Sequence, residues 1–370
     1  MNLTLLATLF LTSMIFHFIM VDYAARLGLV DTPNERSMHK AAIPRGAGIA
    51  MFLSIIAVQA AFNYDQLISY ILVYSAITLV FIIGFIDDVY NVSPRIKFIF
   101  IFFATVLVYN YGIYIDTIGS YFGYAFIVPF FLLFPFTFFA IAGFTNALNL
   151  IDGLDGLAGT IALIMLFTFL TIGINYNDPL ITNLSASFIT VVVAFLIFNW
   201  YPAKIFMGDS GSLTLGFVIA LLSILSMKYV TPTSILFIIA VPLLDTFLVM
   251  TRRIQRGQSP FKADKNHIHH FLYAIKEDIR FTVILLIAIQ SIFSIIGFQL
   301  RAEDDFLSLI LFSLLFFVFL NLFDQRLKRR KKSKKIKKYR RSLQGITPDL
   351  VEDEIVNTHS IYAQNTSEQV

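Results

Sequence analysis

Amide and carboxylate side chains recur every three residues within residues 146–156, at Asn146, Asn149, Asp152 and Asp155. In a helical stretch such residues lie about one turn apart, so the stripe would present several oxygen atoms to one metal ion or sugar phosphate. Polar side chains at the end of an apolar helix are costly without a partner. The stripe therefore predicts a ligand site, with an interfacial cap and turn as the alternative.

Two adjacent acids, Asp87 and Asp88, end another apolar run, and Arg95 and Lys97 follow shortly after them. Adjacent carboxylates repel one another and are normally held near a cation. Magnesium also prefers carboxylate oxygens. The pair therefore predicts a place where a metal ion or a substrate phosphate is held, and the alternative is a solvated helix end.

A Gly-Asp-Ser-Gly-Ser run at residues 208–212 opens a later apolar segment. The free N–H groups at a helix start form a natural anion site, and Asp209 within the run is available to hold a metal ion. The alternative is an ordinary helix cap. Asn199 and Phe206 precede the run, and Phe206 is placed either to stack on a base or to pack in the core.

Three arginines, Arg252, Arg253 and Arg256, open the longest polar loop. Their guanidinium groups suit a pyrophosphate, because they can make bidentate contacts with its oxygens. The alternative is the basic character of any cytoplasmic loop. Asp245 lies just before them in an apolar run, and a carboxylate inside a membrane segment often has a function. The alternative is that its end of the helix is exposed to solvent.

The same loop continues to His267, His269 and His270. Histidines can bind zinc, but this spacing is too tight for a usual structural zinc site, and the chain has no cysteine to assist. We therefore predict that these histidines hydrogen bond to a sugar or a phosphate.

Composition places these motifs in a membrane protein. The chain is 57% hydrophobic and 14% charged, whereas soluble domains are about 45–50% apolar. A helix that crosses the bilayer needs about 20 apolar residues. The sequence therefore predicts an all-α polytopic protein with about eleven transmembrane helices. The apolar runs cover residues 3–22, 46–62, 67–86, 96–113, 126–145, 157–174, 181–198, 212–228, 233–250, 281–300 and 306–323.

The basic residues are distributed asymmetrically about these runs. Of 28 Lys and Arg, only Lys228 and Arg301 fall on the face opposite the polar motifs. Short loops rich in basic residues stay cytoplasmic. We therefore predict a periplasmic N-terminus, a cytoplasmic C-terminus and an active site on cytoplasmic loops, in the inner membrane of a bacterium.

The chain is predicted to comprise a transmembrane catalytic domain, residues 1–323, and a cytoplasmic tail, residues 324–370. The basic run at 328–341 follows the last apolar run directly. We interpret it as an anchor to anionic membrane lipid rather than a nucleic-acid patch, and expect no nucleic-acid partner. The rest of the tail has the composition of a disordered segment.

Taken in order along residues 31–270, the acid pair, the 146–156 stripe, the Phe-Met-Gly-Asp-Ser-Gly-Ser run and the His-Ile-His-His run resemble the polyprenyl-phosphate N-acetylhexosamine-1-phosphate transferases. The loop at 252–270 is most similar to the bacterial undecaprenyl-phosphate GlcNAc-1-phosphate transferases. The resemblance implies transfer of GlcNAc-1-phosphate from UDP-GlcNAc to undecaprenyl phosphate, with release of UMP. The product would initiate a cell-surface polysaccharide such as O antigen.

The resemblance also implies roles for matched positions. Asn149 and Asp209 would hold Mg²⁺, which Mn²⁺ can replace, and Asp152 would support that site. Asp87 and Asp88 would lie beside the attacking lipid phosphate. The other matched residues would bind substrate: Lys97 at the lipid phosphate, Asn146 on the same stripe, Asn199, Phe206 and Asp155 around the uracil, Arg252, Arg253 or Arg256 at the pyrophosphate, and His267, His269 and His270 at the phosphate or sugar.

The first polar loop departs from the family pattern. Where the family has paired basic residues and a Gly-Gly pair, this chain has Ser37 and Gly46-Ala47-Gly48. Roles in this loop therefore stay open. The sequence also leaves open a different UDP-N-acetylhexosamine donor, a homodimer, and a secondary transporter, although transporters bind near the bilayer midplane and are built from repeats, and this chain shows no internal repeat.

Overall fold

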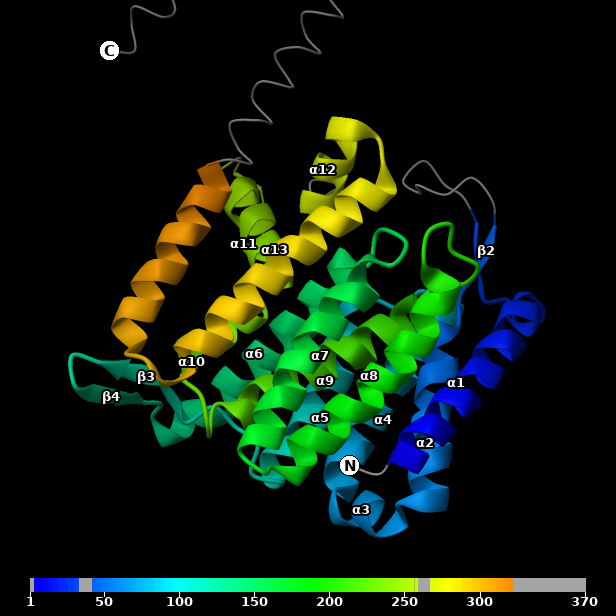
Figure 1. Ribbon diagram of the computed structural model, residues 1–370, viewed down its shortest axis with the longest axis horizontal. Coiled ribbons are helices and arrows are strands. Elements are labelled where there is room, and N and C mark those ends of the chain that lie inside the picture. The colour runs from blue at the N-terminus through cyan, green and yellow to red at the C-terminus, as the bar shows by residue number, and fades with distance from the viewer. Residues whose placement is uncertain (1–2, 33–41, 256, 259–266, 322–370) are drawn as a thin grey trace, which may run out of the picture. The chain divides into compact units, whose positions relative to one another are not determined.

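The computed structural model describes residues 3–32, 42–255, 257–258 and 267–321, and these are mostly helical (Figure 1). The unit Met1–Leu315 contains the polar motifs, and the unit Phe316–Val370 contains the predicted tail, which lies outside the described residues. The labelled helices are α1 Leu3–Tyr23, α2 Ala47–Phe62, α3 Tyr64–Ser69, α4 Ile71–Tyr90, α5 Pro94–Asn110, α6 Phe130–Ile151, α7 Leu157–Asn175, α8 Pro179–Asn199, α9 Gly208–Ser226, α10 Pro232–Ile238, α11 Ala240–Gln255, α12 Ile268–Lys276 and α13 Ile279–Gln299, with short 3-10 turns at Ala24–Leu27 and Leu300–Ala302; a further helix, Asp305–Asn321, follows them.

The predicted apolar runs overlap helices, but not every helix has the length and hydropathy of a membrane span. Within the described residues seven do, and the bent pair α10 and α11 makes an eighth if it is one span. The helices Ala47–Phe62 and Asp305–Asn321 are apolar but shorter. The structure thus supports a multi-pass membrane protein, whereas the number eleven and the orientation of the termini stay predictions.

The predicted run at residues 233–250 is not one straight helix, because α10 and α11 meet at 85°. Pro242 has no N–H to donate to the carbonyl of Ile238, four residues earlier. Gln290 of α13 takes that place: its Nε2 donates to the Ile238 carbonyl at 2.6 Å, and its Oε1 accepts from the Val241 N–H at 3.0 Å. Backbone groups freed inside a membrane helix need such partners, so the break is held by specific contacts.

Two short antiparallel hairpins add to the predicted all-α architecture. In the longer one the strands are joined by Phe122 and Gly123, both with positive φ, 55° and 81°. Two successive residues of positive φ form the two-residue turn whose twist matches that of paired strands. The hairpins are β1 Val30–Asp31 with β2 Ile43–Pro44, and β3 Thr117–Tyr121 with β4 Tyr124–Ile127.

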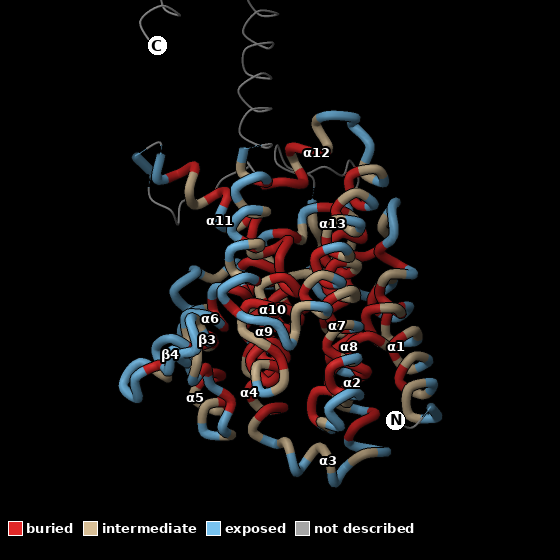
Figure 2. Tube along the Cα trace, turned by 60° about the vertical axis from the view of Figure 1, so that its left-hand side comes forward, coloured by how far each residue is buried: buried red, intermediate tan, exposed pale blue. Residues whose placement is uncertain are grey.

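Helix α9 lies at the centre of the packing. Every residue from Ser210 to Ser226 is buried, and α9 contacts α2, α4, α6, α7 and α8 (Figure 2). Small residues allow this close approach. A Cβ added at Gly84 of α4 would lie 2.6 Å from the Ser210 Cα, and one added at Gly216 would lie 2.9 Å from the Thr145 carbonyl oxygen of α6.

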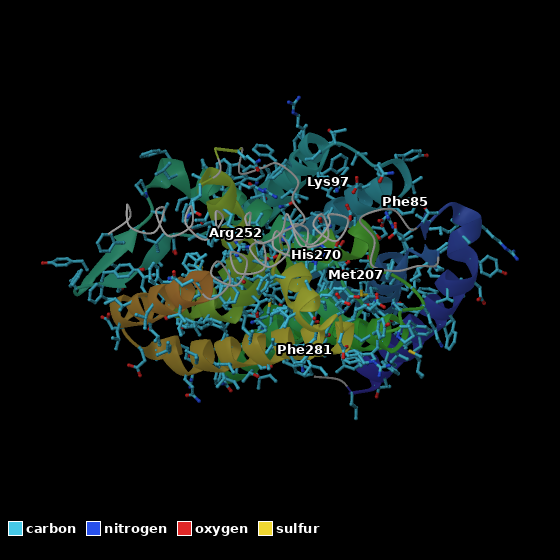
Figure 3. All side chains as sticks on the ribbon, turned by 90° about the horizontal axis from the view of Figure 1, so that it is seen from above. Phe85, Lys97, Met207, Arg252, His270 and Phe281 are labelled. Atoms are coloured by element: carbon cyan, nitrogen blue, oxygen red, sulfur yellow. The ribbon has the colours of Figure 1, made fainter. Side chains whose placement is uncertain are left out.

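The polar motifs come together at one end of these helices, which Figure 3 views from above. The start of α2 joins the segment before α9, because Arg45 and Phe206 form a parallel bridge and Gly48 N–H donates to the Met207 carbonyl at 3.0 Å. This end also holds the C-terminal ends of α4 and α6. The helices therefore bring segments that are about 160 residues apart in sequence to one site, as the bridge from Arg45 to Phe206 shows.

Candidate active site

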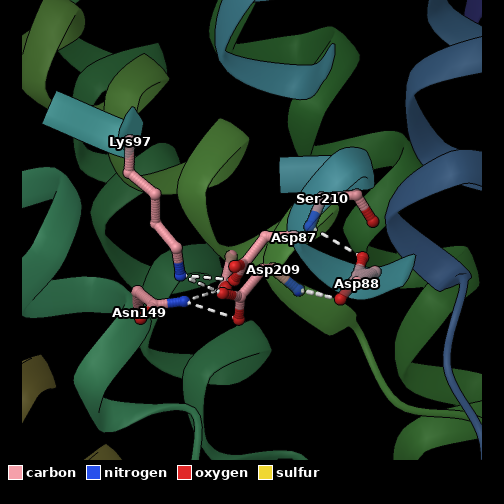
Figure 4. Close-up of polar contacts among 7 residues, drawn as sticks. Asp87, Asp88, Lys97, Asn149, Asp209 and Ser210 are labelled. Atoms are coloured by element: carbon pink, nitrogen blue, oxygen red, sulfur yellow. Dashed lines mark hydrogen bonds and ion pairs between the residues drawn. The ribbon is translucent and has the colours of Figure 1, made fainter. Parts of the chain in front are cut away.

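Lys97, in the first turn of α5, joins two of the predicted acids. Its ammonium group forms an ion pair with Asp87, at the end of α4, and another with Asp209, in the first turn of α9, where Nζ lies 2.6 Å from Oδ2 (Figure 4). The lysine and Asp209 side chains remain partly exposed, at 21% and 30%, whereas Asp87 is nearly covered. The two carboxylates therefore create a negatively charged position that binds a cation, and the exposed fractions show that solvent can reach it.

Asn149 completes this cluster from the last turn of α6. Its Nδ2 donates to Asp209 Oδ1 at 3.0 Å and to the Ser212 hydroxyl at 2.8 Å. Asp209 therefore contacts Lys97 with one carboxylate oxygen and Asn149 with the other. Ser212 was not among the predicted site residues, although its position three residues after Asp209 places both on one face of a helix.

Asp88 faces away from this cluster and holds the start of α9. Its Oδ1 accepts from the Asp209 N–H at 2.7 Å, and its Oδ2 accepts from the Ser210 N–H at 3.0 Å. Met207, the residue before α9, makes no side-chain cap, so Asp88 supplies the cap from another helix. A carboxylate is favoured at a helix N-terminus. The direct catalytic role expected for Asp88 stays a prediction, and its observed contacts are those of a positioning residue.

Asp152 follows α6 directly, in the turn that leads to α7. Burial raises the pKa of its carboxyl to about 7, and the negative charges of Asp209, Asp88 and Asp155 act in the same direction, against a smaller effect of Arg45. Perturbed acids often mark functional sites. Because the charge of Asp209 is the largest electrostatic cause, Asp152 and Asp209 belong to one electrostatic environment; the support that Asp152 would give to a metal site stays a prediction.

Asp155 and Asn199 hold the loop between α8 and α9. Asp155 Oδ2 accepts from the Ala203 N–H at 2.9 Å. Asn199 is buried; its Oδ1 accepts from the Gly156 N–H at 2.8 Å, and its Nδ2 donates to the Ile205 carbonyl at 2.9 Å. These contacts fix the backbone that carries Phe206, which is partly exposed. The structure thus brings the three residues expected around the uracil into one loop cluster.

Among the remaining residues predicted to bind substrate, Asn146 differs from Arg252 and Arg253 in how far it is buried. Asn146 is exposed on α6, one turn before Asn149. Arg252 and Arg253 are buried in the last turn of α11, and Arg256 lies outside the described residues. The role of these arginines at a pyrophosphate therefore stays a prediction. In the first loop, Arg45 forms an ion pair with Asp31.

The rings of His267, His269 and His270 lie against one another at the start of α12 and form what we call the histidine stack, in which the His270 ring is tilted by 44° from that of His269. The rings of His267 and His269 are 5.8 Å apart between centroids and nearly parallel, and His269 and His270 are 4.3 Å apart. His269 is 98% buried against Gly153, where an added Cβ would lie 2.5 Å from its Nε2. Burial holds its pKa well below the usual range, and the neighbouring His270 and His267 act in the same direction. The histidines thus lie against the turn that carries Asp152.

Asp245 is the intramembrane acid that the sequence left open. It is 1% exposed, so its helix end is not solvated. Its Oδ2 lies 2.7 Å from His267 Nδ1, and its Oδ1 accepts from the Ile268 N–H at 2.8 Å. The sequence could mark Asp245 as costly in an apolar run but could not show its partner, 22 residues further along the chain.

Known proteins are similar to this chain over the segment that contains these elements. The sequence model of glycosyl transferase family 4 matches residues 70–227, which include the cluster of Asp87, Lys97, Asn149 and Asp209. A Bacillus subtilis protein named as a probable undecaprenyl-phosphate N-acetylglucosaminyl 1-phosphate transferase is 36% identical over 318 residues, 83% of this chain and 87% of its own length.

Two further relatives carry the name undecaprenyl-phosphate alpha-N-acetylglucosaminyl 1-phosphate transferase. The Escherichia coli K12 protein is 29% identical, with 93% of this chain and 97% of its own length aligned, and the Yersinia pestis protein is 28% identical, with 86% and 92% aligned. This chain belongs to glycosyl transferase family 4. The family resemblance inferred from the motifs and the prediction of a transferase enzyme are thereby confirmed.

Proposed function

We propose that the protein transfers GlcNAc-1-phosphate from UDP-GlcNAc to undecaprenyl phosphate, releasing UMP and forming undecaprenyl-pyrophosphoryl-GlcNAc. The names of the relatives support the substrates. The observation that carries the reaction type is the Lys97 ammonium held between Asp87 and Asp209 beside Asn149. Phosphoryl transfer needs positioning and charge stabilisation rather than a protein nucleophile, and this cluster supplies both.

The residues of the cluster fit a bound magnesium ion. Asp209 and Asn149 offer the hard oxygen ligands that Mg²⁺ prefers, and Mg²⁺ is commonly bound by one or two carboxylates together with substrate phosphates. The described residues include no group of three or more His, Cys, Asp or Glu side chains that could hold a metal ion by themselves, so substrate phosphates would have to supply the remaining ligands. Asn149 would turn its amide oxygen, in place of Nδ2, toward the ion. The bound metal would neutralise charge on the pyrophosphate, and Mn²⁺ could replace it.

The reaction joins the two substrates at the sugar-linked phosphorus. A phosphate oxygen of the lipid forms a bond to that phosphorus, and the bond from phosphorus to the bridging oxygen breaks, so that its electron pair leaves with UMP. Lys97 is placed to balance charge on the attacking phosphate. No general base is required, because a phosphate monoester has a second pKa of about 6 and is mostly dianionic at neutral pH.

The two sides of the cluster would bind the two ends of the donor. The loop that Asn199 and Asp155 hold would bind the uracil, with Phe206 stacking on the base. The histidine stack beside Gly153 would contact the sugar or its phosphate. Undecaprenyl phosphate reaches the site from the bilayer, so the proposed location is the bacterial cytoplasmic membrane with the motif end facing the cytoplasm. The lipid product would start a surface polysaccharide.

The donor is tested with membranes that contain the protein, undecaprenyl phosphate and one radiolabelled UDP-sugar at a time. UDP-GlcNAc should give magnesium-dependent label in the lipid phase, and membranes that contain Asp209→Asn should give almost none. A stronger signal from another UDP-N-acetylhexosamine would replace the proposed donor while keeping the reaction. If every UDP-sugar tested leaves the lipid phase unlabelled, the proposed reaction is wrong.

A further inference from the structure

Asp245 connects α11 to the histidine stack through both of its carboxylate oxygens. One oxygen lies 2.7 Å from Nδ1 of His267, and the other accepts from the N–H of Ile268 at 2.8 Å. Asp245 and His267 are 1% and 5% exposed. A buried carboxylate without partners is strongly disfavoured, so these two contacts stabilise the Asp245 side chain in its buried position.

The first contact selects one form of the His267 ring. A carboxylate that accepts a hydrogen bond from Nδ1 requires the proton to be on Nδ1, and in the neutral ring this leaves Nε2 as the acceptor. Partners of this kind fix both the tautomer and the orientation of a functional histidine. The His267 ring is therefore held in one orientation by a residue outside its own helix.

The second contact holds the helix that carries the other histidines. His267 is the residue before α12, and its own side chain makes no cap there. Asp245 supplies the acceptor instead, from α11, for the first N–H of the helix. A negative charge at this end also interacts favourably with the helix dipole. His269 and His270 follow in the first turn, so their placement depends on the same carboxylate.

The stack in turn lies against the Asp152 turn. His269 is enclosed by Gly153 on one side and by the rings of His267 and His270 on the others. We infer that Asp245 is a positioning residue for the transfer reaction: it sets the His267 tautomer and holds the histidine stack against the turn that carries Asp152. The expected effect on turnover rests on the proposed function, whereas the His267 tautomer and the placement of the histidine stack do not.

The structural content is tested first, without substrate, on full-length protein in detergent. The ¹⁵N NMR signals of the histidine rings report which nitrogen carries the proton, and His267→Gln assigns the His267 signals. At alkaline pH wild-type His267 should show the Nδ1–H form. In Asp245→Asn one acceptor oxygen is replaced by an amide NH₂ group, and that signature should be lost. An Nδ1–H signature unchanged in Asp245→Asn would overturn the inference.

Turnover is tested by a double-mutant cycle. Asp245→Asn and His267→Gln should each lower kcat about 10- to 100-fold, the range found when the orienting partner of a metal-bound histidine is removed, with a smaller change in KM for the donor. The double variant should be little worse than either single variant, because the two residues act as one unit. Independent, multiplying losses would contradict the inference.

Asp305→Asn is the matched control for altering a buried carboxylate. Asp305 is 4% exposed, accepts from the N–H groups of Thr233 and Ser120, and belongs to none of the site motifs. Its variant should keep wild-type kcat and histidine spectra even if its unfolding temperature falls. A loss of turnover in Asp305→Asn equal to that in Asp245→Asn would show a general folding effect and overturn the positioning role. An inactive wild-type protein with the expected NMR result would refute only the proposed reaction.

Discussion

Lys97 and the acids around it show how single residues define the site. The lysine forms ion pairs with Asp87 and Asp209, and Asn149 donates to the second of these acids. Residue types and spacing predicted a metal or phosphate at each of these motifs separately, and the packing brings the four side chains into contact. Spacing could not separate the two adjacent acids, because only the packing of α4 against α9 shows that Asp87 faces the lysine and Asp88 faces the backbone.

Asp209→Asn should reduce turnover to less than about a tenth of wild type at saturating magnesium. The exchange keeps the shape of the side chain but removes the charge that Lys97 and a metal ion require. Donor turnover by the purified protein checks this. Asp178→Asn is the control, since Asp178 caps α8 through the Ile181 N–H and lies outside the motif cluster. Near-normal activity of Asp209→Asn would exclude Asp209 as a metal ligand.

Asp152 should make magnesium binding depend on pH. With a pKa raised to about 7, its carboxyl is mostly neutral at about pH 6 and mostly charged at about pH 8. Magnesium affinity without substrate should therefore rise between these values, and Asp152→Asn should reduce that rise. Calorimetric titration with Mg²⁺ measures both. Equal pH dependence in the two proteins would contradict this placement of Asp152.

The raised pKa also has a consequence for stability. Folded Asp152 binds its proton more tightly than the unfolded chain does, so this group lowers the free energy of unfolding as the pH rises from about 4 to about 7. In metal-free protein, the stability of Asp152→Asn relative to wild type should therefore be greater at about pH 8 than at about pH 5. Thermal unfolding at the two pH values checks the sign.

At the scale of elements, helices cap one another across the site. Asp88 of α4 caps α9, and Asp245 of α11 caps α12. A cap within one segment leaves a local sequence signal, but a cap supplied by another helix does not. The apolar runs predicted where most helices lie. They could not predict features that depend on tertiary packing, namely these caps, the break between α10 and α11, and the β3–β4 hairpin.

Gly153→Ala should lower turnover at least about tenfold. The new Cβ would lie 2.5 Å from Nε2 of His269, so the histidine stack or the Asp152 turn must shift, and displacements of about 1 Å can cost about 100-fold in rate. Gly143→Ala, on α6, is the control, because an added Cβ there meets nothing within 4 Å. The measurement is donor turnover by the two variants at matched expression. Equal activity in the two would show that the turn tolerates the shift.

At the scale of the whole molecule, composition predicted a multi-pass membrane protein and the helices support it. The proposed orientation follows from the position of the basic residues. The full count of crossings could not be settled from hydropathy, because short helices such as Ala47–Phe62 and the bent pair have apolar composition without the length of a straight span.

Orientation is tested by single cysteines in this cysteine-free chain. The buried position of Ser210 makes it a poor site for labelling, so exposed positions are preferable. Cysteines at Ser93, Lys204 and Gln258 should react with a membrane-impermeant thiol reagent only after lysis, whereas those at Asn177 and Glu303 should react in intact spheroplasts. Labelling of Lys204→Cys in sealed cells would place the motif end outside the cytoplasm.

The most direct test of the proposed chemistry follows the phosphorus atoms of the donor. UDP-GlcNAc labelled with ³²P in the phosphate attached to the sugar is incubated with the protein, magnesium and undecaprenyl phosphate. Attack at that phosphorus predicts that the ³²P enters the lipid fraction together with the sugar, and that the nucleotide released is unlabelled UMP. Recovery of the ³²P in UDP, with the sugar alone in the lipid, would mean attack at the sugar carbon and would contradict phosphoryl transfer.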